Sequence, residues 1–333
     1  MFKQMLKELL STYGPSGREE SIAAVIQAYV SPLVDEVRRD ALGSLIAYKR
    51  GTSGRKLMFS AHMDQIGLVV LDADEKGFLR VDPVGNVPEP LAIAREVRFE
   101  NGIQGITYYE TQDVKPDQVK FQHIFVDIGC KSREEALKFV QIGDVAVYTA
   151  GLSEMGARFA SGALDNRVCC ACLIEALKGA RNVHDVYAVF PAQSEVGNRG
   201  AGPAAWSVAP DLCVNLDVTD ALDTPKSQPG SVRLGKGPAI KVMDNSIIVP
   251  KRVREFLLST AQAADIPVQM EVTKLLKTDA GPISLALGGV QTGGLSLPMR
   301  YRHTPVETAD SRDVERMVRL IRAALERRDL PRA

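Results

Sequence analysis

The sequence predicts an α/β fold in which a mixed sheet is flanked by helices and a small β-rich domain is inserted. Helical and strand-like stretches alternate after about residue 156, a pattern typical of helices on both faces of a sheet. Before about residue 66, two helices precede three short strands. Between these parts, short β-like runs are joined by Gly, Pro and Asn turns. We therefore expect a discontinuous main domain, residues 1–66 and 156–333, with residues 67–155 inserted.

The chain opens with helices. Residues 1–10 carry a charge every few positions in an apolar stretch, which predicts an amphipathic helix and argues against a signal-peptide core. A turn cluster at residues 11–17 follows, and Ser16 or Gly17 is expected to cap a second helix. Three runs of branched apolar residues then predict strands at residues 34–38, 45–49 and 56–60.

The remaining elements follow from the same periodicities. In the main domain we expect helices at about 167–179, 200–206, 250–264 and 311–327, and strands at about 186–192, 212–217, 268–273 and 291–297. In the inserted domain we expect strands at 68–71, 78–81, 96–99, 124–127 and 144–149, with one helix at 132–139.

Composition narrows the functional classes. Lys plus Arg equals Asp plus Glu at 41 each, so no overall field favours nucleic acid or an anionic membrane surface. No stretch of about 18 apolar residues is present, so no membrane span is expected. Five cysteines without paired C-x-x-C spacing indicate reduced thiols and a cytoplasmic protein. Cys169, Cys170 and Cys172 fall in an apolar helical run, where we expect them to pack in the core.

Five short segments, far apart in sequence, hold the residues suited to binding metal. The candidate ligands are His62, Asp165, Glu195, Asp217 and His303. Two imidazoles and three carboxylates are the ligand count of a two-metal hydrolytic centre in which one carboxylate bridges the ions. Asp64 lies two residues after His62, so in an extended chain both side chains point to one face and the carboxylate can fix the imidazole tautomer.

Taken singly, each candidate has an ordinary structural explanation. Asp165 stands before a helix and could be its N-cap. Asp217 ends a predicted strand and could form a turn, and His303 could be a loop histidine. Taken together, complementary ligands at several strand ends of one α/β domain favour a metal site, because ligands collect at that edge of open sheets.

The residues around these candidates match a family. The matching motifs are His62-x-Asp64-x-x-Gly67, Ala163-Leu164-Asp165-Asn166-Arg167, Gln193-x-Glu195-Val196-Gly197, Leu216-Asp217-Val218-Thr219, Thr278-Asp279-Ala280-Gly281 and Arg300-Tyr301-x-His303-Thr304-Pro305. Over essentially the whole chain, the sequence resembles the glutamyl aminopeptidase and tetrahedral aminopeptidase family of dinuclear metallopeptidases, some members of which carry an old cellulase label.

The resemblance implies a zinc-exopeptidase-like catalytic domain that acts on short peptides with two divalent ions, Zn²⁺ or Co²⁺, with Mn²⁺ also compatible. It implies that Asp165 bridges the ions and Asp64 orients His62. His62, Glu195, Asp217 and His303 would complete the ligand set. It further implies that residues 67–155 form a dimerisation domain and that dimers build a homo-oligomer, a hollow twelve-subunit tetrahedron.

One position departs from the family pattern. Ser194 stands where the family usually has a glutamate that takes a proton from the attacking water. A hydroxyl can hydrogen-bond the water but has no proton affinity near neutral pH. Three explanations remain open: a weak or repurposed enzyme, a substitute carboxylate such as Glu154 or Asp220, or a deliberate inactivating substitution. A second departure, Leu276-Lys277 where glycines are usual, affects the expected substrate pocket.

Other functions compete with a peptidase. Without a base at position 194, the chain could be a metal-binding oligomeric pseudoenzyme that binds peptides without efficient turnover. A glycoside hydrolase would require two opposed carboxylates. The acidic residues here come with two histidines, which suits a metal site better. A two-metal nuclease would be favoured by positive net charge, which the chain lacks.

Overall fold

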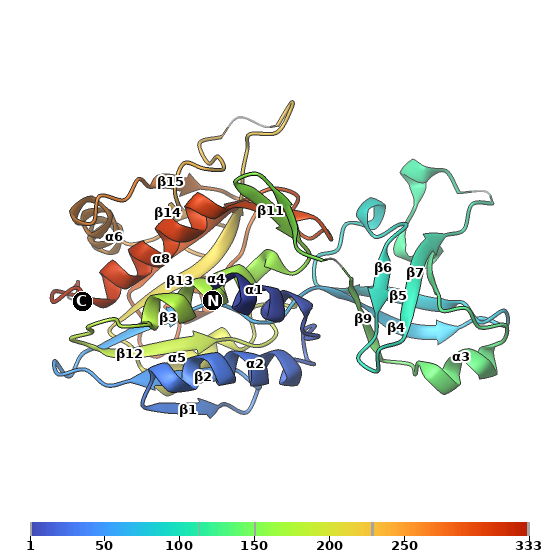
Figure 1. Cartoon of the computed structure of the whole chain (residues 1–333), viewed down its shortest axis with the longest axis horizontal. Helices are drawn as coiled ribbons and strands as arrows, with labels where there is room; N and C mark the ends of the chain where they lie inside the picture. Colours follow the sequence, from blue (N-terminus) through green and yellow to red (C-terminus); the bar gives the residue numbers. More distant parts are fainter. Residues whose placement is uncertain (1, 113, 150, 228–229, 332–333) are drawn as a thin grey trace.

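The computed structural model describes residues 2–112, 114–149, 151–227 and 230–331, and has a larger α/β part and a small barrel (Figure 1). Neighbouring strands of the eight-stranded main sheet run in the order β1-β2-β12-β3-β13-β16-β14-β15. Their bounds are β1 Glu36–Arg39, β2 Leu45–Lys49, β3 Lys56–Ser60, β12 Asp185–Phe190, β13 Leu212–Asp220, β14 Ala239–Met243, β15 Gln269–Val272 and β16 Thr292–Met299.

Four adjacent strands in the middle of this sheet are parallel. β12 pairs with β3, β3 with β13 and β13 with β16, all in the same direction. β1, β2 and β14 add antiparallel pairs, and β15 lies parallel to β14. The predicted mixed sheet is therefore confirmed, and the carboxyl ends of its four central strands meet at one edge.

Helices cover both faces of the sheet. Their bounds are α1 Phe2–Ser11, α2 Glu20–Val30, α4 Leu164–Leu177, α5 Ala201–Val208, α6 Lys251–Ala263, α7 Ala280–Ser284 and α8 Ser311–Leu325. Buried side chains of α1, α2, α4, α6 and α8 share the larger core, whereas those of α5 and Ile283 of α7 belong to a separate cluster. α8 shows why: Val314, Met317, Val318 and Ile321 recur at helical spacing and line one buried face.

The β-rich segment closes into a barrel, seen at the right of Figure 1. Its strands are β4 Gly67–Ala73, β5 Leu79–Val84, β6 Glu96–Arg98, β7 Gln104–Tyr109, β8 Ile124–Asp127 and β9 Val145–Tyr148, with the helix α3 Arg133–Phe139 beside them. The barrel has its own apolar core, and closure pairs strand edges that would otherwise be open. The domain limits at residues 67 and 155 stay a prediction.

A small three-stranded sheet joins distant parts of the chain. It orders β10 Ser153–Met155, β11 Arg158–Ser161 and β17 Glu307–Asp310. β11 lies antiparallel to β17, which places Ser161 opposite Glu307. The sheet therefore brings the segment before α4 close to the segment that carries His303.

Two sequence-based expectations are wrong in detail. α2 begins at Glu20 without a side-chain cap, and the Ser16 hydroxyl donates to Asp64 Oδ2 at 2.6 Å. The sequence also gave no prediction of β7, β14, α7 or the small sheet, because these segments are short or interrupted by Gly and Pro.

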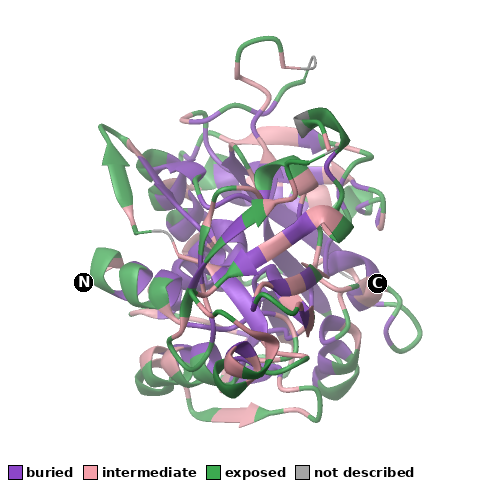
Figure 2. Cartoon of the chain, turned by 90° about the vertical axis from the view of Figure 1, so that its right-hand side faces the viewer, coloured by how far each residue is buried: buried purple, intermediate pink, exposed green. Residues whose placement is uncertain are grey.

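Burial follows the layers, with purple interior strands enclosed by green and pink surface segments (Figure 2). Cys169, Cys170, Cys172 and Cys213 are all buried, as expected for core thiols. Among the described residues, no helix is both long and apolar enough to cross a membrane.

Candidate metal centre

The candidate ligands gather at the carboxyl edge of the four parallel strands. His62 lies two residues beyond β3, Glu195 lies in the loop after β12, and His303 lies in the loop after β16. Asp217 does not end its strand as expected, because β13 continues beside β16 to Asp220. However, β3 pairs with β13 only as far as Asn215, so Asp217 lies just beyond the end of its other neighbour.

Asp165 comes from the first turn of α4. The N-cap position is Ala163, in the left-handed region, and Asp165 and Asn166 have non-helical dihedrals joined by a cis peptide bond. Asp165 is therefore not the N-cap that its sequence position allowed. The neighbouring Asn166 side chain donates to the Leu216 carbonyl at 2.8 Å, which ties this turn to β13.

Two groups of three ligands share Asp165. Ligand atoms of His62, Asp165 and Asp217 lie within 4.8 Å of one another, and so do those of Asp165, Glu195 and His303. His62 Nε2 lies 3.4 Å from Asp165 Oδ1, and His303 Nε2 lies 3.4 Å from Asp165 Oδ2. Each oxygen of one carboxylate therefore faces a different histidine, which is the arrangement expected of a bridging ligand.

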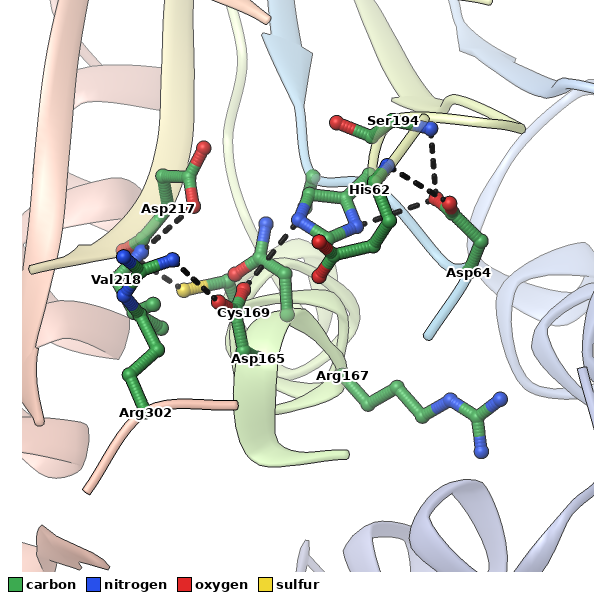
Figure 3. A network of polar contacts seen from close by, with 12 residues as sticks. His62, Asp64, Asp165, Arg167, Cys169, Ser194, Asp217, Val218 and Arg302 are labelled. Atoms are coloured by element: carbon green, nitrogen blue, oxygen red, sulfur yellow. Dashed lines mark hydrogen bonds and ion pairs between the residues drawn. The ribbon is translucent and has the colours of Figure 1, made fainter. Parts of the chain in front are cut away.

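Asp64 connects His62 to the loop that carries Glu195. Its Oδ1 lies 3.3 Å from His62 Nδ1, a contact drawn in Figure 3. Its two oxygens also accept the backbone N–H groups of Ser194 and Glu195, each at 3.0 Å. Because its Nδ1 faces this carboxylate, His62 directs Nε2 toward Asp165, which is the orientation predicted from the His62-x-Asp64 spacing.

Glu307 is a positioning residue that the sequence analysis missed. It is buried on β17, where Oε2 accepts from the Asp165 backbone N–H at 2.9 Å and Oε1 from the His303 backbone N–H at 2.7 Å. One carboxylate thus fixes the main chain of two candidate ligands. The sequence signal that could have pointed to Glu307 is its position two residues after the Thr304-Pro305 motif.

The barrel also contributes to the site. His303 Nδ1 lies 2.7 Å from the Asn86 carbonyl in the loop after β5. A carbonyl can only accept, so Nδ1 carries a proton, and Nε2 is the ring nitrogen that faces Asp165 and Glu195. The neighbouring Gly85 packs closely, since a Cβ there would lie 3.1 Å from Glu195 Cβ.

Two arginines lie around the centre, and both are labelled in Figure 3. Arg167 is fully buried and donates to the carbonyls of Leu9 and Gly14 near the end of α1 and of Met63 beside His62. Arg302 lies against the ligands themselves, with Nη1 2.9 Å from His303 Nε2 and 3.6 Å from Asp165 Oδ2. Arg167 therefore ties the backbone beside His62 to the segment around the end of α1, whereas Arg302 adds positive charge next to the candidate ligands.

Ser194 contacts the carboxylate of Asp279, a residue to which the sequence alone gave no role in the site. Its hydroxyl donates to Asp279 Oδ1 at 2.8 Å, and the Asn198 amide donates to both atoms at 3.0 and 2.9 Å. The two substitute carboxylates suggested by the sequence each pair with a basic side chain. Glu154 is exposed and pairs with Lys3 at 2.5 Å, and Asp220 pairs with Arg302 at 3.4 Å.

Buried carboxylates and histidines lie close together in the centre and shift one another's pKa values. Burial acts to lower the pKa of His303, but Glu195 and Asp165 outweigh it and raise the pKa to about 10. The pKa of His62 is likewise raised by Asp165 and Asp64 against the effect of burial. Burial raises the pKa of Asp217 to about 7, and the Asp165 charge adds to this effect. Without ions, protons therefore balance the carboxylate charge.

The residues fit a pair of divalent ions. Asp165 Oδ1 is buried without a hydrogen-bond partner in the described part of the chain, which is costly unless another group satisfies it. Imidazole nitrogens and carboxylate oxygens suit Zn²⁺, Co²⁺ and Mn²⁺ alike. Among the described residues, no cysteine belongs to either group of possible metal ligands.

Known proteins share this fold and sequence. Residues 43–320 match the M42 glutamyl aminopeptidase family. A lysyl aminopeptidase of Pyrococcus furiosus is 36% identical over 97% of this chain and 96% of its own length. An aminopeptidase structure from the archaeon Desulfurococcus kamchatkensis has a TM-score of 0.94 at 34% identity, covering 98% of this chain and 94% of its own.

A further structure bears on assembly. The Pyrococcus horikoshii TET1 peptidase, which can assemble into a tetrahedron or a large octahedral shell, has a TM-score of 0.88 at 30% identity, covering 98% of this chain and 99% of its own. These similarities extend over nearly the whole molecule. The chain belongs to the M42 family of metal-dependent aminopeptidases.

Proposed function

We propose that this protein removes N-terminal residues from short peptides with two divalent ions, Zn²⁺ or Co²⁺, held by His62, Asp165, Glu195, Asp217 and His303. The observation that carries this proposal is the shared position of Asp165 in two groups of nitrogen and oxygen ligands. The ions would polarise the scissile carbonyl and acidify the attacking water.

The protein's own residues keep the ligands in position for this chemistry. Asp64 holds His62 and the main chain at Ser194 and Glu195. Glu307 holds the main chain of Asp165 and His303. With two ligand loops fixed by each carboxylate, the centre is organised before substrate binds, which lowers the cost of reaching the reactive geometry.

Ser194 would make this enzyme slow. The hydroxyl donates to Asp279 and has no proton affinity near neutral pH, so it cannot alone accept a proton from water. General acid–base catalysis contributes about 10²–10⁴-fold, and the ions supply a separate part of the acceleration. We expect measurable turnover below that of relatives with a glutamate.

The test compares the unchanged chain with Ser194→Glu on a panel of aminoacyl-anilides, after loading with Zn²⁺ or Co²⁺. The panel includes lysyl and glutamyl substrates, and Leu276-Lys277 beside the Asp279 loop predicts that side-chain preference differs from that of relatives with glycines there. We expect activity in both proteins, larger by about 10²–10⁴-fold in the variant. Asp165→Asn serves as the ion-binding control. If neither protein releases product while both bind two ions, the aminopeptidase proposal fails in favour of a peptide-binding pseudoenzyme.

We further propose a cytoplasmic homo-oligomer, a dodecamer built from dimers, with residues 67–155 as the dimerisation domain. The barrel supports this role because it exposes large apolar side chains, among them Ile106 and Tyr108 on one face of β7, exposed by 48% and 43%. Sedimentation of the chain and of Ile106→Glu/Tyr108→Glu tests it. A monomeric unchanged chain would contradict the proposal.

A further inference from the structure

A hydrogen-bonded pair lies beside the candidate metal centre where a glutamate base is missing. The Ser194 hydroxyl donates its hydrogen to Asp279 Oδ1 at 2.8 Å, and Asn198 donates to the Ser194 oxygen at 3.0 Å. The hydroxyl hydrogen is thereby directed to the carboxylate. Its second oxygen lone pair stays available to a water, because a hydroxyl oxygen accepts twice.

Asp279 is not explained by an ordinary structural role. It occupies the N-cap position of α7 but its side chain makes no cap hydrogen bond. Its Oδ1 accepts from Ser194 and Asn198, whereas its Oδ2 is buried without a partner in the described part of the chain. An unsatisfied buried carboxylate oxygen costs stability, so its presence calls for a function.

The loop that carries Asp279 is firmly held. The preceding Thr278 hydroxyl donates to Asp244 Oδ2 at 2.8 Å. Lys241, fully buried, lies 3.3 Å from the same oxygen and 2.7 Å from Glu271. This buried ion-pair cluster fixes the loop from the side of the sheet and leaves the Asp279 side chain to meet Ser194.

We propose that Ser194 and Asp279 together replace the missing glutamate, with the Ser194 hydroxyl relaying a proton from the attacking water to Asp279. The proposal rests on the aminopeptidase function above. The water gives one proton to Ser194 Oγ as the hydroxyl proton moves to Asp279 Oδ1. The remaining hydroxide adds to the scissile carbonyl carbon, the carbon–nitrogen bond breaks, and the reverse relay returns the proton to the leaving amine nitrogen.

The charged groups around Asp279 are compatible with this role. His62 and Asp64 after β3 and Asp217 on β13 all interact with it electrostatically. Burial raises the pKa of Asp279, while His62 and the hydrogen bonds from Asn198 and Ser194 act in the opposite direction. A raised pKa makes a carboxylate a better proton acceptor near neutral pH.

Asp279→Asn, made in the unchanged chain and in the Ser194→Glu background, tests the relay. Asparagine keeps an oxygen that accepts from Ser194 but loses the proton affinity. In the unchanged background we expect kcat to fall by about tenfold or more, the part of the 10²–10⁴-fold acid–base contribution that the relay retains. Ser194→Ala should lower kcat by a similar factor, with no further loss in the double variant. In the Ser194→Glu background the new carboxylate takes the proton, so Asp279→Asn should change kcat by less than about threefold.

Three further measurements separate proton transfer from positioning. Asp244→Asn, which weakens the anchor of the same loop, should lower kcat by an equal factor in both backgrounds. Ion content should stay at two per chain in the Asp279→Asn protein. Difference infrared spectra of the chain against Asp279→Asn should show the carboxyl bands of Asp279, shifted in Ser194→Ala because a hydrogen bond is lost.

The outcomes distinguish this inference from the function beneath it. An equal loss from Asp279→Asn in both backgrounds would make Asp279 a positioning residue and overturn the relay. Unchanged kcat in Asp279→Asn would overturn it as well. If the unchanged chain and Ser194→Glu are both inactive, the aminopeptidase proposal falls and the relay with it.

Discussion

The two halves of the candidate metal centre are built differently. His62, Asp165 and Asp217 are attached to the main sheet and the helix packed on it, and all three are buried. Glu195 and His303, which complete the other half with Asp165, lie on loops. His303 is supported from outside the main sheet, by Glu307 on the small sheet and by the carbonyl of Asn86 beside the barrel, whereas the Glu195 backbone is held by Asp64.

The difference shows that the position of some ligands is fixed by the sheet and that of others by loop contacts. Parallel strands fix where their ends lie, so the first half follows from the core of the main domain. The second half needs the barrel loop and the small sheet in place. We therefore expect damage at the barrel to affect the ion held by Glu195 and His303 while leaving the other ion bound.

Asp165→Asn should break both halves and have the largest effect. The change removes a charge and leaves one ligand oxygen where two oxygens face two histidines. We expect affinity for both ions to fall by more than about 100-fold, beyond the 10–100-fold typical of residues that only orient ligands. Calorimetric titration with Zn²⁺ measures this. Asp220→Asn, a nearby acid outside both groups, is the control, and an equal loss there would contradict a bridging role.

Ion binding should strengthen with pH in both halves. His303, with a pKa raised to about 10, is protonated at neutral pH and must lose that proton to bind an ion. Affinity of the second half should therefore rise about tenfold per pH unit between pH 7 and 10. Below pH 7, Asp217 adds a competing proton in the first half, since its pKa is about 7. Titrations in buffers of different ionisation enthalpy count the released protons. Affinity that is constant from pH 7 to 9 would contradict this account.

The sequence predicted the first half better for the same physical reason. His62 and Asp217 follow apolar runs that end at one edge, so periodicity located them. Even there, the end of β13 was placed three residues early, because pairing with β16 extends the strand past its apolar run. Glu195 and His303 were named as candidate ligands from their residue types, and the resemblance to the family added their roles in the ligand set.

What the sequence could not predict is contact between loops. Glu307 is far in sequence from Asp165, Asn86 from His303 and Asp279 from Ser194, and none of the three stands in a periodic pattern. Their roles depend on how the barrel, the small sheet and α7 close around the centre. Local propensity carries no information on such contacts, so the sequence offered Glu154 and Asp220 as substitute bases, and the contact of Ser194 with Asp279 became visible only in the fold.

Gly85→Ala should weaken the second half selectively. Gly85 has a φ of +84°, and an added Cβ would lie 2.9 Å from Ile66 Cγ2 and 3.1 Å from Glu195 Cβ. We expect affinity for the ion at Glu195 and His303 to fall about 10–100-fold. Gly102→Ala is a matched control, since Gly102 has a φ of +88° but nothing within 4 Å of its Cβ position. Similar losses from both would show backbone strain alone, without coupling to the centre.

Arg302→Gln should have a smaller effect in the opposite direction. Its guanidinium contacts His303 Nε2 and Asp165 Oδ2, so it competes with a cation for the same electrons and adds repulsion. Because Asp220 also pairs with this guanidinium and offsets part of its charge, the penalty is only partial. We expect ion affinity to rise about three- to tenfold. Arg300→Gln, which removes a nearby guanidinium paired with Asp223, should leave affinity unchanged. Weaker binding in Arg302→Gln would instead mean that Arg302 holds Asp165 in its bridging position.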